Sequence, residues 1–168
     1  MHRRVQELVR LSTLIVTSIG LVLALSTPLI SLGNLYDLYL FPRNNLLEVS
    51  SEQRASQWLH SIATICALSG TTVLFANILL TRRLPLAVQE NMDALITILT
   101  HLTFVCHVIG FLCLLSVAAA WKHRVENIPL PVEVRLRAGA YGDVLGLLAA
   151  ASGVSVGGLM TREPYVSL

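Results

Sequence analysis

The sequence predicts an all-α membrane protein, a four-transmembrane-helix bundle that forms a single domain over residues 1–168. The first observation is composition. Hydrophobic residues make up 54% of the chain and charged residues 13%, whereas roughly a quarter of the residues in a soluble domain are charged. The second observation is that the uncharged residues gather in four long runs. Each run can cross the ~30 Å of membrane hydrocarbon at about 1.5 Å per helical residue.

The four runs predict helices with these approximate bounds: 11–32, 58–81, 95–121 and 139–160. The first run exceeds the apolar core of about 7–15 residues found in a cleaved signal peptide, so we expect it to remain as a helix. Arg82 and Arg83 end the second run, and Lys122 ends the third. Pro28 lies near the far end of the first run, where a lost backbone hydrogen bond costs little.

Charge bears on orientation and on partners. With a cytoplasmic N-terminus, six Lys or Arg residues lie on each side of the membrane. The first helix usually sets the orientation, and Arg3, Arg4 and Arg10 precede it. We therefore expect cytoplasmic N- and C-termini, in a plasma membrane or an endosomal or lysosomal membrane. A net charge of +2 from scattered basic residues argues against nucleic acid as a partner.

Short motifs along most of the chain resemble a known family. They are Ser-Thr-Pro (26–28), Leu-Tyr-Asp-Leu-Tyr (35–39), Gln-Trp-Leu-His-Ser (57–61), the small-residue helix end at 112–121, and Ala-Gly-Ala-Tyr-Gly (138–142). In this layout the chain resembles the peripheral myelin protein, epithelial membrane protein and claudin superfamily. The resemblance implies a claudin-like bundle that acts as a cell-contact or barrier protein, or as an accessory subunit of other membrane proteins.

The first predicted outer loop, about residues 33–57, departs from that family. The family closes this loop with two cysteines and places a tryptophan in it, and this loop has neither. A disulfide-stapled outer sheet is therefore not expected. Residues 35–41 fit either a short strand or part of an aromatic belt at the membrane interface. Cys66, Cys106 and Cys113 lie within apolar runs, and we interpret them as small buried hydrophobes.

The fourth predicted helix carries small residues at helical spacing. They are Ala138, Gly142, Gly146, Ala150, Gly153 and Gly157. Small side chains let two helix backbones approach closely, which drives helix association in lipid. This seam either packs within the bundle of the monomer or receives a helix of a partner.

Asp143 is the one carboxylate within the four predicted runs. An ionisable group at that depth usually has a partner or reaches water. We hypothesise an intramembrane polar pair between Asp143 and His60, which lies at similar depth on the second helix. The alternative is that Asp143 reaches the interface beside Arg135 or Arg137.

The third predicted helix carries two histidines, His101 and His107. They are separated by about 120° around the helix. His60 lies nearer the outer side, so neither finds a partner at matched depth on another helix. A haem held between helices needs such a match, so we interpret both as hydrogen-bonded core or cavity residues.

The C-terminal segment ends in a short pattern that peptide-binding domains recognise. Tyr165 with Leu168 fits a tyrosine-based sorting signal, and Val166 with Leu168 fits capture of the terminal carboxylate by a PDZ-type domain. The remaining alternative is an idle tail.

Patterns typical of catalysis are missing from the sequence. It has no nucleophile elbow, phosphate-binding glycine loop, HExxH motif or CxxC pair. We therefore predict a protein that is not an enzyme and has no cofactor or metal, with membrane lipids and other integral membrane proteins or itself as partners. Three functions remain open: an accessory subunit of a channel, receptor or membrane complex; a claudin-like structural or adhesion protein; and a small haem-binding oxidoreductase or transporter.

Overall fold

The computed structural model describes residues 3–32, 36–41, 50–80, 84–126 and 134–160. Its elements are α1 (Arg3–Ser26), β1 (Ile30–Leu32), β2 (Tyr36–Leu38), α2 (Ser51–Leu80), α3 (Leu86–Glu126), β3 (Val134–Leu136) and α4 (Ala138–Met160). Each of these four helices is long and apolar enough to cross a membrane. The predicted four-helix architecture is therefore confirmed for the described residues.

Prolines and a capping residue explain where the helix bounds differ from the prediction. α1 ends at Ser26 rather than near residue 32, because Pro28 disfavours a helical conformation in the residue before it. α3 begins at Leu86 rather than near residue 95, directly after Pro85, and proline is favourable at a helix start. α2 begins at Ser51, where the Ser50 hydroxyl caps the helix by accepting a 3.2 Å hydrogen bond from the Gln53 amide.

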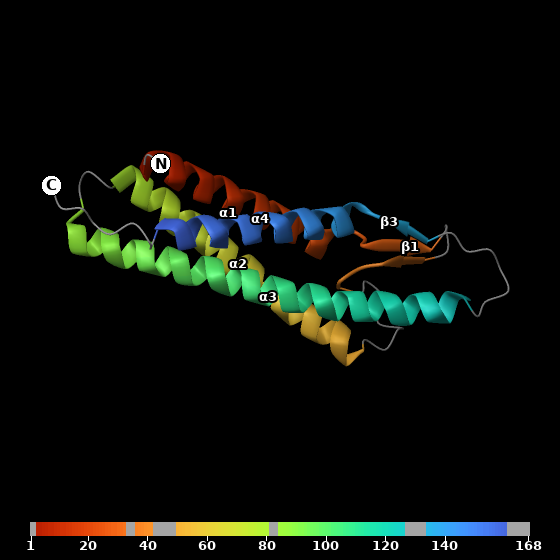
Figure 1. Cartoon of the computed structure of the whole chain (residues 1–168). Coiled ribbons are helices and arrows are strands. Elements are labelled where there is room, and N and C mark those ends of the chain that lie inside the picture. Colours follow the sequence, from red (N-terminus) through yellow and green to blue (C-terminus); the bar gives the residue numbers. More distant parts are fainter. Residues whose placement is uncertain (1–2, 33–35, 42–49, 81–83, 127–133, 161–168) are drawn as a thin grey trace.

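A small antiparallel sheet, of which the sequence predicted only a possible strand at residues 35–41, closes one end of the bundle (Figure 1). Its strand order is β2-β1-β3, and Ile30 lies opposite Leu38 on one side and Leu136 on the other. Residues 36–38 are thus a strand, one of the two alternatives for that stretch. The sheet joins the chain after α1 to the chain before α4.

Hydrogen bonds hold this sheet in place without a disulfide. The Arg137 guanidinium donates from Nε to the Ser31 hydroxyl on β1 at 2.9 Å. On the other side, the Gln57 amide on α2 donates to the Leu40 carbonyl at 2.7 Å. The three cysteines are free thiols, with Cys66 and Cys106 buried and Cys113 partly buried.

The helices form two closely packed pairs, α1 with α4 and α2 with α3. Figure 1 shows the sheet at one end, here called the sheet end. At the opposite end, here called the hairpin end, α1 begins, α2 passes into α3, and α4 ends. Large apolar side chains such as Ile19, Ile65, Ile98 and Leu145 face outward, whereas many buried side chains are small or polar. This distribution is typical of helices packed in lipid, where burial of apolar surface does not drive helix association.

Gly142, Gly146 and Gly153 on α4 pack against α1. A Cβ on Gly20 of α1 would lie 2.8 Å from the Gly146 Cα, and one on Gly142 would lie 2.7 Å from the Leu23 Cβ. Toward the hairpin end, a Cβ on Gly153 would lie 3.1 Å from the Thr13 hydroxyl. The two backbones approach this closely because glycine lacks a Cβ.

These contacts decide between the two uses predicted for the small-residue seam. α1 covers Gly142, Gly146 and Gly153, and Ala150 is also buried. Along this stretch the seam therefore packs within the bundle, against α1. Ala138 is exposed at the start of α4, and the surroundings of Gly157 lie outside the described residues.

Candidate functional site

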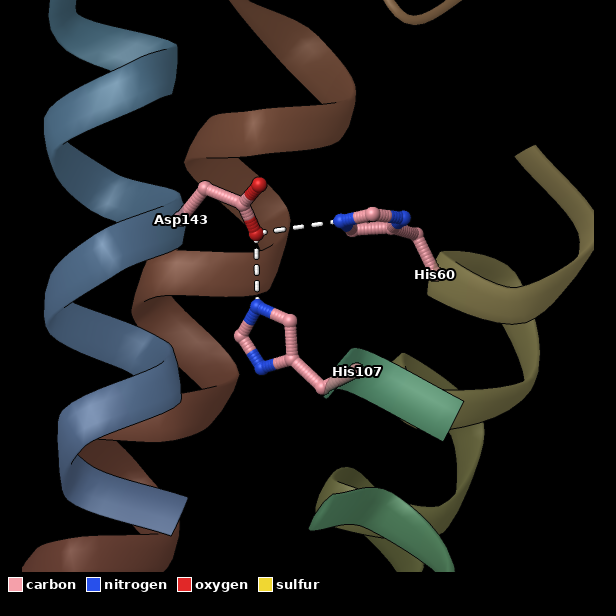
Figure 2. Close-up of side chains that lie close together, drawn as sticks. All are labelled: His60, His107 and Asp143. Carbon is pink, nitrogen blue, oxygen red and sulfur yellow. Dashed lines mark hydrogen bonds and ion pairs between the residues drawn. The ribbon is translucent and has the colours of Figure 1, made fainter. Parts of the chain in front are cut away.

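Three side chains from three helices meet in the bundle (Figure 2). The Asp143 carboxylate of α4 lies with its Oδ1 3.0 Å from the His60 Nε2 of α2 and 2.6 Å from the His107 Nε2 of α3. All three side chains are 0% exposed. We call them the histidine cluster. Both imidazole rings point at the same carboxylate oxygen.

The packing of α2 against α3 fixes the ring of His60. The Ser56 hydroxyl, one turn before His60, donates to the Gly110 carbonyl on α3 at 2.9 Å. Gly110 itself lies against the imidazole, since a Cβ there would approach the His60 Nδ1 to 2.7 Å and its Cε1 to 2.9 Å. Only glycine leaves room for the ring at this crossing.

α1 supports the cluster without contributing a side chain to it. A Cβ on Gly146 would lie 3.2 Å from the His107 Cε1 and 3.3 Å from the Gly20 Cα. On the α1 side, the Thr17 hydroxyl lies 3.3 Å from the Gly146 carbonyl. The close pairing of α1 and α4 therefore sets the position of the helix that carries Asp143.

The hydrogen bonds of His60 require a proton or a metal ion between its ring and Asp143. The His60 Nδ1 lies 2.8 Å from the Ser56 carbonyl oxygen, which can only accept, so Nδ1 carries the hydrogen. In a neutral ring the Nε2 of His60 then presents a lone pair to the Asp143 oxygen. Two lone pairs facing each other repel, so a proton or a metal ion must lie between them.

Two polar atoms of the cluster remain without a hydrogen bond. Asp143 Oδ2 and His107 Nδ1 are buried and have no hydrogen-bond partner among the described residues. Buried polar atoms nearly always have a hydrogen-bond partner. Where one has none, an ion or a water molecule is a common reason. Asp143 Oδ2 can therefore accept a proton or a metal ion, whereas an ion at the Nε2 atoms would leave His107 Nδ1, the other nitrogen of that ring, unsatisfied.

The structure brings the hypothesised pair together and adds a third member. His60 and Asp143 are hydrogen-bonded, so the carboxylate does not depend on Arg135 or Arg137. The expectation that His107 lacks a partner on another helix is wrong, because its ring centroid lies 5.4 Å from that of His60. His101 is exposed and hydrogen-bonds to its own helix at the Thr97 carbonyl, so the interpretation of His101 as a core residue is also wrong.

The sequence analysis placed His60 and His107 at different depths because it began the third helix near residue 95 instead of at Leu86. His60 lies 20 residues before the end of α2 at Leu80, and His107 lies 21 residues after the start of α3 at Leu86. Counted from the turn that joins the two helices, the histidines are level. Counting from Pro85 instead of from residue 95 would have paired them.

The approach of the two rings also bears on the haem alternative. A haem needs an axial ligand on each face of its macrocycle. Here both Nε2 atoms converge on one carboxylate oxygen, so the space between them holds Asp143 rather than a macrocycle.

A second polar group, which the sequence analysis missed, lies near the hairpin end. We call it the arginine cluster. It consists of Arg10 on α1, Asn77 on α2, and Asp93 and Thr97 on α3. Arg10 is only 5% exposed, although the sequence analysis placed it in the cytoplasmic flank, because α1 begins at Arg3 rather than near residue 11.

No protein-family model and no curated protein matches this chain. The predicted sorting or PDZ-binding tail, Tyr165, Val166 and Leu168, lies outside the described residues. The histidine cluster is therefore the site on which the chemistry of the described chain can be argued.

Proposed function

We propose that the chain is an integral membrane protein of claudin-like layout that works without catalysis, as an accessory subunit of a channel, receptor or other membrane complex. A structural or adhesion role is the alternative within the same layout. The observation that supports the layout is the antiparallel sheet that joins the segments flanking α1 and α4 at one end of four apolar helices.

The exposed faces of the helices support lateral contact as the mode of action. With the small-residue seam covered by α1, contacts with other membrane proteins fall on the outward-facing apolar residues. Each helix offers such residues, for instance Ile65 at 65% exposed on α2 and Leu145 at 59% on α4. Close packing inside the bundle and apolar side chains outside suit a compact subunit that sits beside larger partners.

The site-specific test uses a photo-crosslinking amino acid in the native membrane. We expect adducts with one or a few integral membrane proteins when the crosslinker replaces Ile65 or Leu145. The matched control places it at Ala67, which is 0% exposed on α2 and should give none. Adducts between two copies of this chain only would favour the structural or adhesion role, and exposed positions that capture lipid alone would contradict the proposal.

Orientation is tested separately. We place the hairpin end on the cytoplasmic side, with both chain termini there. A protease added outside intact cells should leave an epitope tag at either terminus uncut and should cut a tag inserted between β2 and α2. The opposite pattern would invert the proposed orientation.

A further inference from the structure

We propose that His60, His107 and Asp143 form a binding site for a divalent first-row transition metal, with Zn²⁺ as the reference ion. The three potential ligand atoms lie within 4.8 Å of one another and come from three different helices. The inference does not depend on the proposed function, because it concerns the interior of the bundle.

The types of ligand select the class of metal. Imidazole nitrogen and carboxylate oxygen both bind zinc, and three protein ligands leave a fourth position open for water or another ligand. Ca²⁺ takes six to eight oxygen ligands and Mg²⁺ strongly prefers oxygen, so a site with two imidazoles disfavours both. The same ligand set also suits Fe²⁺, so the identity of the ion is a measured outcome.

The His60 ring makes a contact that is compatible with a metal ligand, although the exposed His101 makes the same contact with its own helix. Histidines that bind metals almost always donate their other ring hydrogen to a carbonyl or carboxylate, which fixes the tautomer. The His60 Nδ1–H does so to the Ser56 carbonyl at 2.8 Å. This directs the Nε2 lone pair at the Asp143 carboxylate, where a metal ion would replace the proton that must otherwise lie between them.

Binding a metal ion requires the three ligand atoms to be rearranged. Bonds of about 2.0–2.1 Å to a tetrahedral zinc separate neighbouring ligand atoms by about 3.3 Å. The Asp143 Oδ1 lies 3.0 Å from one Nε2 and 2.6 Å from the other. The carboxylate must therefore withdraw by less than ~1 Å, and the two Nε2 atoms, which lie within 4.8 Å of each other, must also come to a separation of about 3.3 Å. Its second oxygen, Oδ2, is buried and has no hydrogen bond within the described part of the chain, so turning the carboxylate breaks no such bond.

The first experiment measures stoichiometry on the full-length chain in lipid nanodiscs after treatment with a chelator. Equilibrium dialysis against Zn²⁺ followed by elemental analysis should find one ion per chain. Bound zinc should also raise the thermal midpoint, because an ion that binds only the folded state stabilises it. Co²⁺ should replace the zinc and give the visible absorption of a four-coordinate site with nitrogen and oxygen ligands.

The second experiment compares two histidines of the same helix. His107→Gln should weaken the affinity for Zn²⁺ by on the order of a hundredfold, since even the loss of an outer-shell partner costs about 10–100-fold. His101→Gln is the control, because His101 is exposed and lies outside the cluster. His107→Cys supplies another zinc ligand and should recover binding, and it decides the question if His107→Gln does not fold.

Two results would overturn the proposal. One is a wild-type chain that binds no Zn²⁺, Co²⁺ or Fe²⁺ above the level of empty nanodiscs, which would make the cluster a hydrogen-bonded ion pair only. The other is an equal loss of binding in His101→Gln and His107→Gln, which would place the ion elsewhere.

Discussion

Two groups of polar side chains join the helices, and they are built differently. In the histidine cluster, two Nε2 atoms converge on a single oxygen of Asp143. In the arginine cluster, the hydrogen bonds run as a chain: Arg10 donates to the Thr97 hydroxyl at 3.0 Å, and Thr97 donates to the Asp93 carbonyl at 2.8 Å. The Arg10 guanidinium also interacts electrostatically with the Asp93 carboxylate. Asn77 then donates to the Asp93 carboxylate at 3.0 Å.

The histidine cluster has the geometry of a binding site, whereas the arginine cluster serves to connect helices. Groups that converge on one point create a place for a cation, and their stability depends on what occupies that point. The arginine cluster instead holds α1, α2 and α3 together through several separate interactions. Removing one member should therefore have unequal consequences in the two clusters, and the following substitutions test this.

Removal of the carboxylate from the histidine cluster should cause the largest loss in the free energy of unfolding. Asp143→Leu leaves two buried imidazoles without their shared acceptor, and breaking a buried pair by removing one partner costs about 3–5 kcal/mol. Reversible unfolding in mixed detergent micelles measures the change in the free energy of unfolding. Asp37→Leu is the control, because Asp37 is exposed on β2, and we expect a change within about 0.5 kcal/mol. Equal stability of Asp143→Leu and the wild type would contradict the assignment of Asp143 as the centre of the cluster.

A substitution that crowds the His60 ring should cause an intermediate loss in the free energy of unfolding. In Gly110→Ala the new Cβ would lie 2.7 Å from the His60 Nδ1, and the ring cannot move without lengthening its bonds to Ser56 and Asp143. Overpacking of this kind costs about 1–3 kcal/mol. The measurement is again the free energy of unfolding.

Gly70→Ala is the matched control for that substitution. A Cβ on Gly70 would meet side chains at 3.6 Å or more, which is ordinary contact. The higher helix propensity of alanine, worth up to ~1 kcal/mol, should then leave the protein equally or more stable. If both alanine variants behave alike, the ring of His60 is not held rigidly.

The sequence predicted the bundle and part of the cluster for identifiable reasons. Long uncharged runs reveal helices directly. The pair of Asp143 and His60 could be predicted because both residues lie near the start of their predicted helices. The apolar run through Pro28 concealed a boundary, since α1 and β1 are equally apolar. Sequence also could not show that Arg10 is buried, because an arginine before an apolar run usually stays in the solvent.

The predicted start of a helix decides the depth at which its residues are placed, as His107 shows. With the third helix starting at Leu86, the residue is level with His60, and the metal-ligand set becomes visible. Metal ligands close together in sequence can be recognised by spacing. These three come from α2, α3 and α4, so only the packing of the helices shows them.

Removal of one hydrogen-bonding group from the arginine cluster should cause the smallest loss in the free energy of unfolding. Thr97→Val keeps the shape of the side chain and removes the hydroxyl that accepts from Arg10 and donates to Asp93. The loss of a hydrogen bond costs about 0.5–1.5 kcal/mol, and the Arg10–Thr97 bond is one link of a chain that leaves the Asn77–Asp93 bond in place. Thr72→Val is the control, because Thr72 is exposed and bonds only within α2, and it should change the free energy of unfolding by less than about 0.5 kcal/mol. A loss in Thr97→Val as large as that in Asp143→Leu would show that the arginine cluster also depends on a single point, and the distinction between the two clusters would fail.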